Sequence, residues 1–302
     1  MKRGTRKPEI ALLGAGRLGS SLAIALDDAG YRVVAVASRR RAAAGALAKR
    51  LKRAEVCPAR ELWARAPLVI LAVPDDALAQ VAAGAQVQPG QAVVHCSGAL
   101  GLDVLAPVAE RGGRRGCLHP LQAFPERYAP ERLHGVSCGI DGDGALAAQL
   151  ARLVRALGAR PFSLRGADRA RYHAAAVLAS NYVVALRAAA EDAWALAGLP
   201  RAQAGVALQP LTRGAVDALG ALPLERALTG PIARGDVQTV ARHLQALAAK
   251  PELHALYGQL AAQLIARPLS LPRARLAALR ALLAEAAAAP RKRPGRGARR
   301  VI

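Results

Sequence analysis

The segment Ile10-Ala11-Leu12-Leu13-Gly14-Ala15-Gly16-Arg17-Leu18-Gly19 joins an apolar, strand-like run to the start of an amphipathic helix. Its glycines follow the pattern GxGxxG. In this pattern the first glycine permits a tight turn, the second lets a pyrophosphate approach the backbone, and the third lets the helix pack closely on the strand. The pyrophosphate would lie at the positive N-terminus of the helix. We therefore expect a dinucleotide to contact Gly14, Ala15, Gly16, Arg17, Leu18 and Gly19. The alternative is a glycine-rich turn in an unrelated α/β domain.

Short β-branched runs alternate with helical patterns through the first half of the chain. The expected strands lie at residues 9–13, 32–37, 68–73, 92–96, 136–140 and 160–164. The expected helices lie at about residues 17–29, 41–52, 76–83 and 145–157. This alternation predicts an α/β fold, in which a Rossmann-type, doubly wound and mostly parallel sheet carries helices on both faces.

The pattern changes near residue 165, and Ala- and Leu-rich helical segments replace the strands. We expect a Rossmann dinucleotide-binding domain over residues 8–165 and an all-helical domain for substrate binding and dimerisation over residues 166–286. A basic extension at residues 1–7 and a basic, disordered tail at residues 287–302 would flank them. A chain of 302 residues is long enough for two such domains.

The formal net charge of +22 favours anionic ligands. Basic residues cluster at the two ends of the chain, without zinc-finger spacing or an RNA-binding aromatic signature, so nucleic acid is not the expected partner. Cys57, Cys96, Cys117 and Cys138 form no CxxC pair, which argues against a disulfide framework and a zinc site. A catalytic thiol stays open as an alternative. We find no signal peptide or membrane segment, and we expect a cytoplasmic protein without a metal site.

The end of the second expected strand indicates which dinucleotide binds. NAD-binding proteins place an acidic residue there, against the ribose hydroxyls. This chain has no acid between Tyr31 and Ala54 and carries Ser38, Arg39 and Arg40 instead. A serine hydroxyl can donate to a 2′-phosphate, and a guanidinium can neutralise it. The sequence therefore favours NADP over NAD. The alternative is that the arginines are the solvated start of a helix.

Two further strand ends face the same edge of the expected sheet. Val73 ends the third run and Pro74 follows it, while Ser97 follows the fourth run. Ligands bind outside the carboxyl ends of strands in open α/β sheets, so we expect Val73 and Pro74 to contact the cofactor and Ser97 to face the substrate. Ordinary turn chemistry explains these residues equally well.

Several segments together carry a resemblance to a known family. These segments are residues 14–19, the run Gly116-Cys117-Leu118-His119-Pro120-Leu121-Gln122-Ala123-Phe124, the helix motif Tyr172-His173-Ala174-Ala175-Ala176 with Ala179-Ser180-Asn181-Tyr182, and Leu228-Thr229-Gly230-Pro231 with Arg234-Gly235-Asp236. Over about residues 8–285 the chain resembles the Rossmann-like proteins that carry a C-terminal DUF2520 domain. Their wider relatives are the 6-phosphogluconate dehydrogenase-like proteins, including pyrroline-5-carboxylate reductases, prephenate dehydrogenases and β-hydroxyacid dehydrogenases. The resemblance implies a Rossmann domain, a helical domain that often dimerises, and an oxidoreductase of unspecified reaction.

The His119-Pro120 segment resembles a segment of prephenate dehydrogenases, whose histidine contacts the substrate hydroxyl and whose serine lies upstream, as Ser97 does here. The following Leu-Gln-Ala-Phe departs from the glycine-containing continuation in those enzymes and argues against prephenate. In β-hydroxyacid dehydrogenases a catalytic lysine precedes an asparagine by one helical turn. If Asn181 matches that asparagine, Val177 takes the place of the lysine.

On one continuous helix, His173, Val177, Ser180 and Asn181 would fall within about a 100° arc. Polar groups on an otherwise apolar helix need partners when they are buried. This stripe either faces a substrate or makes interhelical hydrogen bonds.

These observations predict an NADP-dependent oxidoreductase that moves a hydride between nicotinamide and a small, anionic C=O or C=N substrate. His119 or His173 would act as general acid or base, because imidazole titrates near neutral pH, while Ser97 and Asn181 would orient the substrate. The expected assembly is a homodimer through the helical domain. The alternative is a non-catalytic NADP-binding regulatory or scaffold protein.

Overall fold

The computed structural model describes residues 7–288, so the expectations for the basic ends fall almost entirely outside the described residues. The chain divides into two compact units after Asn181. Within the described range, no helix has both the length and the apolar character that a membrane crossing requires.

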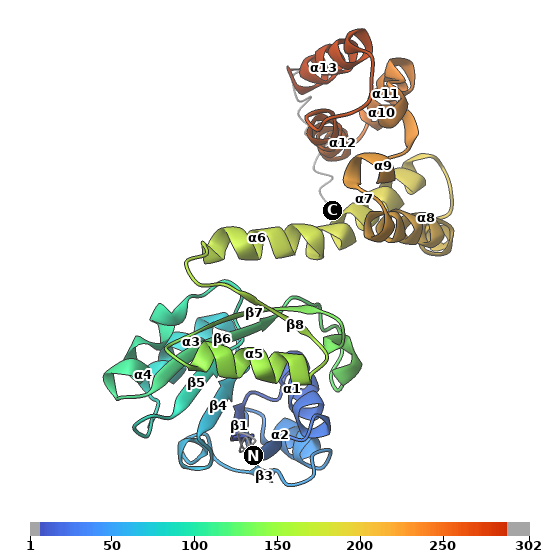
Figure 1. Ribbon diagram of the computed structural model, residues 1–302. Helices are drawn as coiled ribbons and strands as arrows, with labels where there is room; N and C mark the ends of the chain where they lie inside the picture. The colour runs from blue at the N-terminus through green and yellow to red at the C-terminus, as the bar shows by residue number, and fades with distance from the viewer. Residues whose placement is uncertain (1–6, 289–302) are drawn as a thin grey trace, which may run out of the picture. The chain divides into compact units, whose positions relative to one another are not determined.

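An eight-stranded sheet forms the first unit (Figure 1). Its strands are β1 Glu9–Leu13, β2 Arg32–Ala37, β3 Glu55–Val56, β4 Leu68–Leu71, β5 Ala92–His95, β6 Arg114–Pro120, β7 Ser137–Gly142 and β8 Arg160–Ser163. The spatial order is β3-β2-β1-β4-β5-β6-β7-β8, and every neighbouring pair is parallel except β6 with β7. The strand order therefore reverses between β1 and β4, which is where doubly wound sheets bind ligands. The predicted Rossmann-type, mostly parallel sheet is confirmed.

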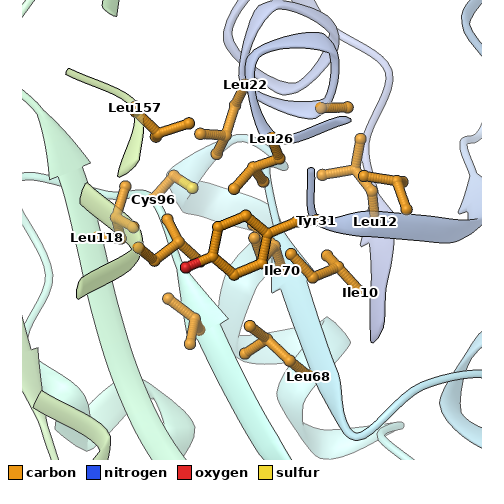
Figure 2. Close-up of a cluster of buried hydrophobic side chains, with 14 of the residues drawn as sticks. Ile10, Leu12, Leu22, Leu26, Tyr31, Leu68, Ile70, Cys96, Leu118 and Leu157 are labelled. Atoms are coloured by element: carbon orange, nitrogen blue, oxygen red, sulfur yellow. The ribbon is translucent and has the colours of Figure 1, made fainter. Parts of the chain in front are cut away.

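Helices cover both faces of this sheet. One face packs against α1 Arg17–Asp28, α2 Arg41–Ala48 and α5 Leu146–Ala156. The apolar positions of α5 recur at helical spacing, and its Leu146, Leu150 and Leu153 are fully buried. Figure 2 shows the Tyr31 ring within this core, among Leu26, Ile70 and Leu118. The opposite face packs against α3 Asp75–Ala83, α4 Ala106–Glu110 and short 3-10 turns.

Helix α6, Arg169–Ala179, is the last helix of the first unit along the chain. The Asp168 side chain caps it by accepting from the backbone N–H of Arg171 at 3.0 Å. The helix ends at Ser180, whose φ of −125° and ψ of −71° leave the helical region, and α7 begins at Asn181. The expected polar stripe on one continuous helix is therefore wrong. Because the helical rotation stops at Ser180, only His173 and Val177 of that stripe share a face of α6.

The second unit is helical, as expected. Its helices are α7 Asn181–Leu196, α8 Arg201–Ala221, α9 Leu224–Ala227, α10 Gly230–Arg234, α11 Val237–Leu247, α12 Pro251–Ile265 and α13 Arg273–Ala288. Helices α10 to α13 share a small apolar core that includes Ile232, Val240 and Leu279. Helices α7 and α8 contribute little to a core, because no residue of α7 and only Ala204 of α8 are buried.

Candidate dinucleotide and substrate site

The turn between β1 and α1 places each glycine of the motif in a distinct role. Gly14 has a φ of +113°, and a Cβ atom there would lie 2.2 Å from the carbonyl oxygen of Ala72. A Cβ atom on Gly19 would lie 2.0 Å from the carbonyl oxygen of Gly14. Gly16, in contrast, has no atom within 4 Å of its Cβ direction. Gly14 and Gly19 therefore permit close packing, while Gly16 leaves the backbone open to a ligand.

The N-terminus of α1 fits the pyrophosphate of a dinucleotide. Gly16 is its N-cap residue, no side chain caps the helix, and the first turn contains no acid. The backbone N–H groups of a first helical turn have no partner within the helix, and the helix dipole favours negative charge there. Among the other motif residues, Ala15 is buried and Arg17 is exposed. The open face of Gly16 and the uncapped helix end lie together, as binding of a pyrophosphate requires.

The carboxyl end of β2 lies beside this turn, since the backbone N–H of Gly14 donates to the carbonyl oxygen of Ala37 at 2.8 Å. Ser38 is half-buried, whereas Arg39 and Arg40 are exposed at the start of α2. Within residues 7–288, neither arginine side chain forms a hydrogen bond or an ion pair. These side chains fit a phosphate on the adenosine ribose of a bound dinucleotide.

The carboxyl end of β4 borders the same turn from the other side. The backbone of Ala72 and Val73 lies against Gly14, since a Cβ atom on Gly14 would meet both residues. Pro74 is the exposed N-cap residue of α3. Val73 and Pro74 are thus placed at the switch point where a dinucleotide would cross the sheet edge.

A polar cluster occupies the neighbouring end of the sheet. His95, Cys117 and Asp141 stand opposite one another on β5, β6 and β7. Arg169 of α6 donates to the Asp141 carboxylate at 3.0 Å and lies 3.5 Å from the Cys117 sulfur. The Arg169 and Asp141 side chains are only 9% and 15% exposed, so this ion pair holds the start of α6 against the sheet.

His119, at the end of β6, is the centre of a second group. Its Nδ1 atom lies 2.7 Å from the hydroxyl of Tyr172 on α6. The His119 and His173 ring centroids are 6.4 Å apart. Burial, and then the nearby His173, lower the pKa of His119 to about 4, so the ring is neutral at pH 7. The structure thus brings both predicted histidines together and adds Tyr172, Arg169 and Asp141, which were not among the predicted site residues.

Ser97 and Asn181 are placed differently from the histidines. The Ser97 Oγ atom accepts from the backbone N–H groups of Ala99 and Leu100 at 3.2 and 3.1 Å, and the residue is buried. It therefore shapes its own turn, which positions Gly98 against the His119 ring. Asn181 is exposed beyond the helix break.

All four cysteines are free and buried. Burial raises the pKa values of Cys117 and Cys138 to about 11 and raises that of Cys96 further. Because the thiolate is the reactive form, these three cysteines are not nucleophiles at neutral pH.

Two family models match the chain in succession. Residues 3–120 match a Rossmann-like domain, and residues 136–264 match a domain of unknown function, DUF2520. The chain combines a Rossmann-like domain with a DUF2520 domain. The resemblance drawn from the sequence motifs is therefore confirmed. The DUF2520 match covers residues 136–264, so this domain model includes strands β7 and β8 of the sheet, helix α5 between them, and helices α6 to α12 except the last residue of α12.

Solved structures that are similar to this chain include a candidate NADP oxidoreductase from Bacteroides fragilis, with 27% identity, a TM-score of 0.70, and coverage of 86% of this chain and 99% of that one. A protein from Thermotoga maritima has 25% identity, a TM-score of 0.68, and coverage of 84% and 96%. A 1-pyrroline-5-carboxylate reductase from Streptococcus pyogenes, with 16% identity, a TM-score of 0.59, and coverage of 85% and 98%, shares the fold. No curated protein sequence matches this Rossmann-like and DUF2520 chain.

Proposed function

We propose that this chain is an NADP-dependent oxidoreductase that transfers a hydride between nicotinamide and a small carbonyl or imine substrate. The observation that carries the proposal is the open backbone at Gly16, which precedes the uncapped α1 beside the β1/β4 switch point. A pyrophosphate is the ligand that this arrangement suits. The similarity to the Bacteroides fragilis protein, a candidate NADP oxidoreductase, supports the same class.

The residues around this turn would bind different parts of the cofactor. Gly14 to Gly19 would hold the pyrophosphate, Ser38, Arg39 and Arg40 the 2′-phosphate, and Val73 and Pro74 the path toward the nicotinamide. The bound nicotinamide supplies or accepts the hydride. His119, with Tyr172 on its Nδ1 atom, would hold or move the proton at the substrate, and His173 would line the same space. We also propose Asn181 as a substrate contact. It lies at the start of α7, after the backbone leaves the helical region at Ser180.

The first prediction concerns cofactor choice. We expect the full chain to bind NADPH more tightly than NADH, because Arg39 is free to pair with a 2′-phosphate that NADH lacks. Replacing Arg39 with alanine should weaken NADPH binding by roughly 1.5–3 kcal/mol, the usual value of a hydrogen bond to a charged group, and leave NADH binding nearly unchanged. Isothermal titration of both proteins with both cofactors measures the difference. Equal binding of NADPH and NADH by the unaltered protein would refute the assignment of NADP.

A non-catalytic NADP-binding protein is the second candidate. If Asn181 matches the asparagine of β-hydroxyacid dehydrogenases, Val177 takes the place of their catalytic lysine and favours this candidate. The two candidates differ in turnover. Consumption of NADPH with 2-oxo acids or cyclic imines, abolished by His119→Ala, supports the enzyme. Cofactor binding without turnover across such a panel supports the alternative.

We further propose that the helical unit forms a homodimer. Val184 on α7 and Val206 and Leu211 on α8 are 72%, 78% and 73% exposed, so these helices present apolar surface that their own unit does not cover. Light scattering should give the mass of a dimer at micromolar concentration. The double change Val206→Glu and Leu211→Glu should give a folded monomer, while Arg213→Glu on the same helix should not. A stable monomer of the unaltered chain would contradict the proposal.

A cytoplasmic location and an anionic substrate remain predictions. The substrate prediction depends on the net charge of +22, which would attract an anion to the protein.

A further inference from the structure

We propose that Tyr172 fixes His119 in the tautomer that carries its proton on Nε2, and that His119 thereby donates a hydrogen bond to a substrate carbonyl oxygen. This inference rests on the proposed oxidoreductase function and narrows its substrate from a carbonyl or imine to a carbonyl compound. It assigns Tyr172 as a positioning residue that acts through His119.

The two side chains meet although they are 53 residues apart in the sequence. The Tyr172 hydroxyl lies 2.7 Å from Nδ1 of His119, and the two rings pack edge to face with centroids 5.6 Å apart. Phe162 of β8 packs against the other side of Tyr172, with centroids 6.1 Å apart. Gly98 admits the His119 ring, since a Cβ atom there would lie 2.7 Å from Cε1 of His119. The pair is therefore held by packing on both sides.

The direction of the hydrogen bond follows from the chemistry of the phenol. Burial raises the pKa of Tyr172 to about 12, so its hydroxyl keeps its proton at pH 7. A half-buried phenol requires an acceptor, and within residues 7–288 its hydroxyl has His119 Nδ1 as its one hydrogen-bond partner. Tyr172 therefore donates and Nδ1 accepts. A neutral imidazole that accepts at Nδ1 carries its proton at Nε2.

The surroundings keep this imidazole neutral. Burial has the largest effect in disfavouring a positive charge on His119, and His173 and Arg169 of α6 act in the same direction. Asp75 at the start of α3 opposes them, but the combined effect lowers the pKa of His119 to about 4. The ring thus offers one N–H donor at neutral pH.

The Nε2 atom of His119 is free to meet a ligand. Across residues 7–288, no protein group forms a hydrogen bond with it. In the same range, Nε2 of His95 is the one side-chain nitrogen or oxygen that is fully buried and has no hydrogen-bond partner. Nε2 of His119 therefore keeps some exposure to solvent, on a ring that lies against Gly98. An accessible donor on an otherwise held ring is suited to a substrate acceptor.

The donor selects between the two substrate classes. Hydride addition to a carbonyl carbon develops an alkoxide, and an N–H donor stabilises that negative charge. Neutral histidines are known to polarise carbonyl groups in this way. An imine accepts hydride readily only as its protonated iminium ion. That ion is itself an N–H donor and carries positive charge that hydride addition removes, so it gains nothing from a second donor.

The proton balance is complete. As hydride reaches the carbonyl carbon, the Nε2–H of His119 donates a hydrogen bond to the developing alkoxide, and the alkoxide takes a proton from solvent to become the product alcohol. His119 keeps its proton on Nε2 and Tyr172 keeps its phenol proton, so the protein is unchanged after the reaction. The net change is one hydride and one proton added to the carbonyl compound.

Long-range proton–nitrogen NMR of histidine-labelled full chain, free and with NADP+, tests the tautomer directly. His119→Asn identifies the His119 signals. We expect the Nε2–H form in the unaltered protein between pH 6 and 8, and a mixture of tautomers in Tyr172→Phe. Tyr257→Phe is the matched control, because Tyr257 forms the same kind of pair, at 2.9 Å, with His243 in the other unit. It should alter His243 alone. An Nδ1–H form of His119, or an unchanged tautomer in Tyr172→Phe, would overturn the assignment.

NADPH consumption with paired 2-oxo acids and cyclic imines tests the substrate class. We expect turnover of 2-oxo acids with kcat/KM at least about tenfold lower in Tyr172→Phe, the loss of roughly one well-placed hydrogen bond in the transition state. Turnover of imines alone would overturn this inference and leave the proposed oxidoreductase intact. Failure to bind NADPH would refute the proposed function. The NMR measurement of the free protein would still decide the tautomer of His119, because it does not depend on NADPH binding.

Discussion

Replacing Gly14 with alanine is expected to destabilise the protein by roughly 3–5 kcal/mol, which combines the strain of a non-glycine residue at this backbone angle with steric overlap in a packed core. The φ of +113° disfavours any side chain, and the new Cβ atom would lie 2.2 Å from the carbonyl oxygen of Ala72, where only backbone could move. Domains are commonly stable by about 5–15 kcal/mol, so the loss would be a large fraction of the total. Urea denaturation followed by circular dichroism measures it.

Gly16→Ala is the matched control within the same turn. Gly16 has a φ of −78°, and nothing lies within 4 Å of its Cβ direction. Its replacement should change the free energy of unfolding by less than about 1 kcal/mol, as surface changes without strain usually do. Equal stability of the Gly14→Ala and Gly16→Ala variants would show that the turn is not packed as described.

Replacing Arg169 with methionine is expected to cost about 3–5 kcal/mol, because it leaves the Asp141 carboxylate without its partner in a largely buried site. The pair is 3.0 Å apart with both side chains at most 15% exposed. Chemical denaturation gives the change in free energy.

Two variants separate loss of this pair from loss of arginine alone. Arg171→Met removes an ion pair with Asp168 in which the side chains are 89% and 49% exposed, and it should cost less than about 1 kcal/mol. The double change Arg169→Met and Asp141→Leu should recover much of the lost stability, because it removes the unpaired charge. If Arg169→Met were no more destabilising than Arg171→Met, α6 would not depend on this pair.

Much of the sheet could be predicted because a parallel strand that is buried on both faces appears as a short apolar run. Strands β1 and β2 occupy the predicted residues, and β4 and β5 end within two residues of the prediction. Strand β6 was not identified, since it begins with Arg114 and Arg115 and ends in Pro120. It forms because β5 and β7 pair with it on both sides, which is information that no local pattern contains.

The candidate site, like the sheet, could be predicted only in part from the sequence. The glycine turn could be predicted because its residues are consecutive and each meets a local steric requirement. The contacts of His119 with Tyr172 and of Arg169 with Asp141 join distant segments, so the individual residues gave no sign of them. The stripe from His173 to Asn181 failed for a local reason, since the backbone at Ser180 departs from the helix that the residue spacing assumed.

Titration of NADPH into the full chain and into Gly16→Ala tests the central claim most directly. The claim is that the open backbone at Gly16 receives the pyrophosphate of NADP. We predict that the unaltered protein binds NADPH and that Gly16→Ala, although as stable, binds it more weakly by roughly 2 kcal/mol, or about 30-fold, because a methyl group separates the pyrophosphate from the backbone donors. Equal affinity of the two proteins for NADPH, or no binding by either, would contradict the account.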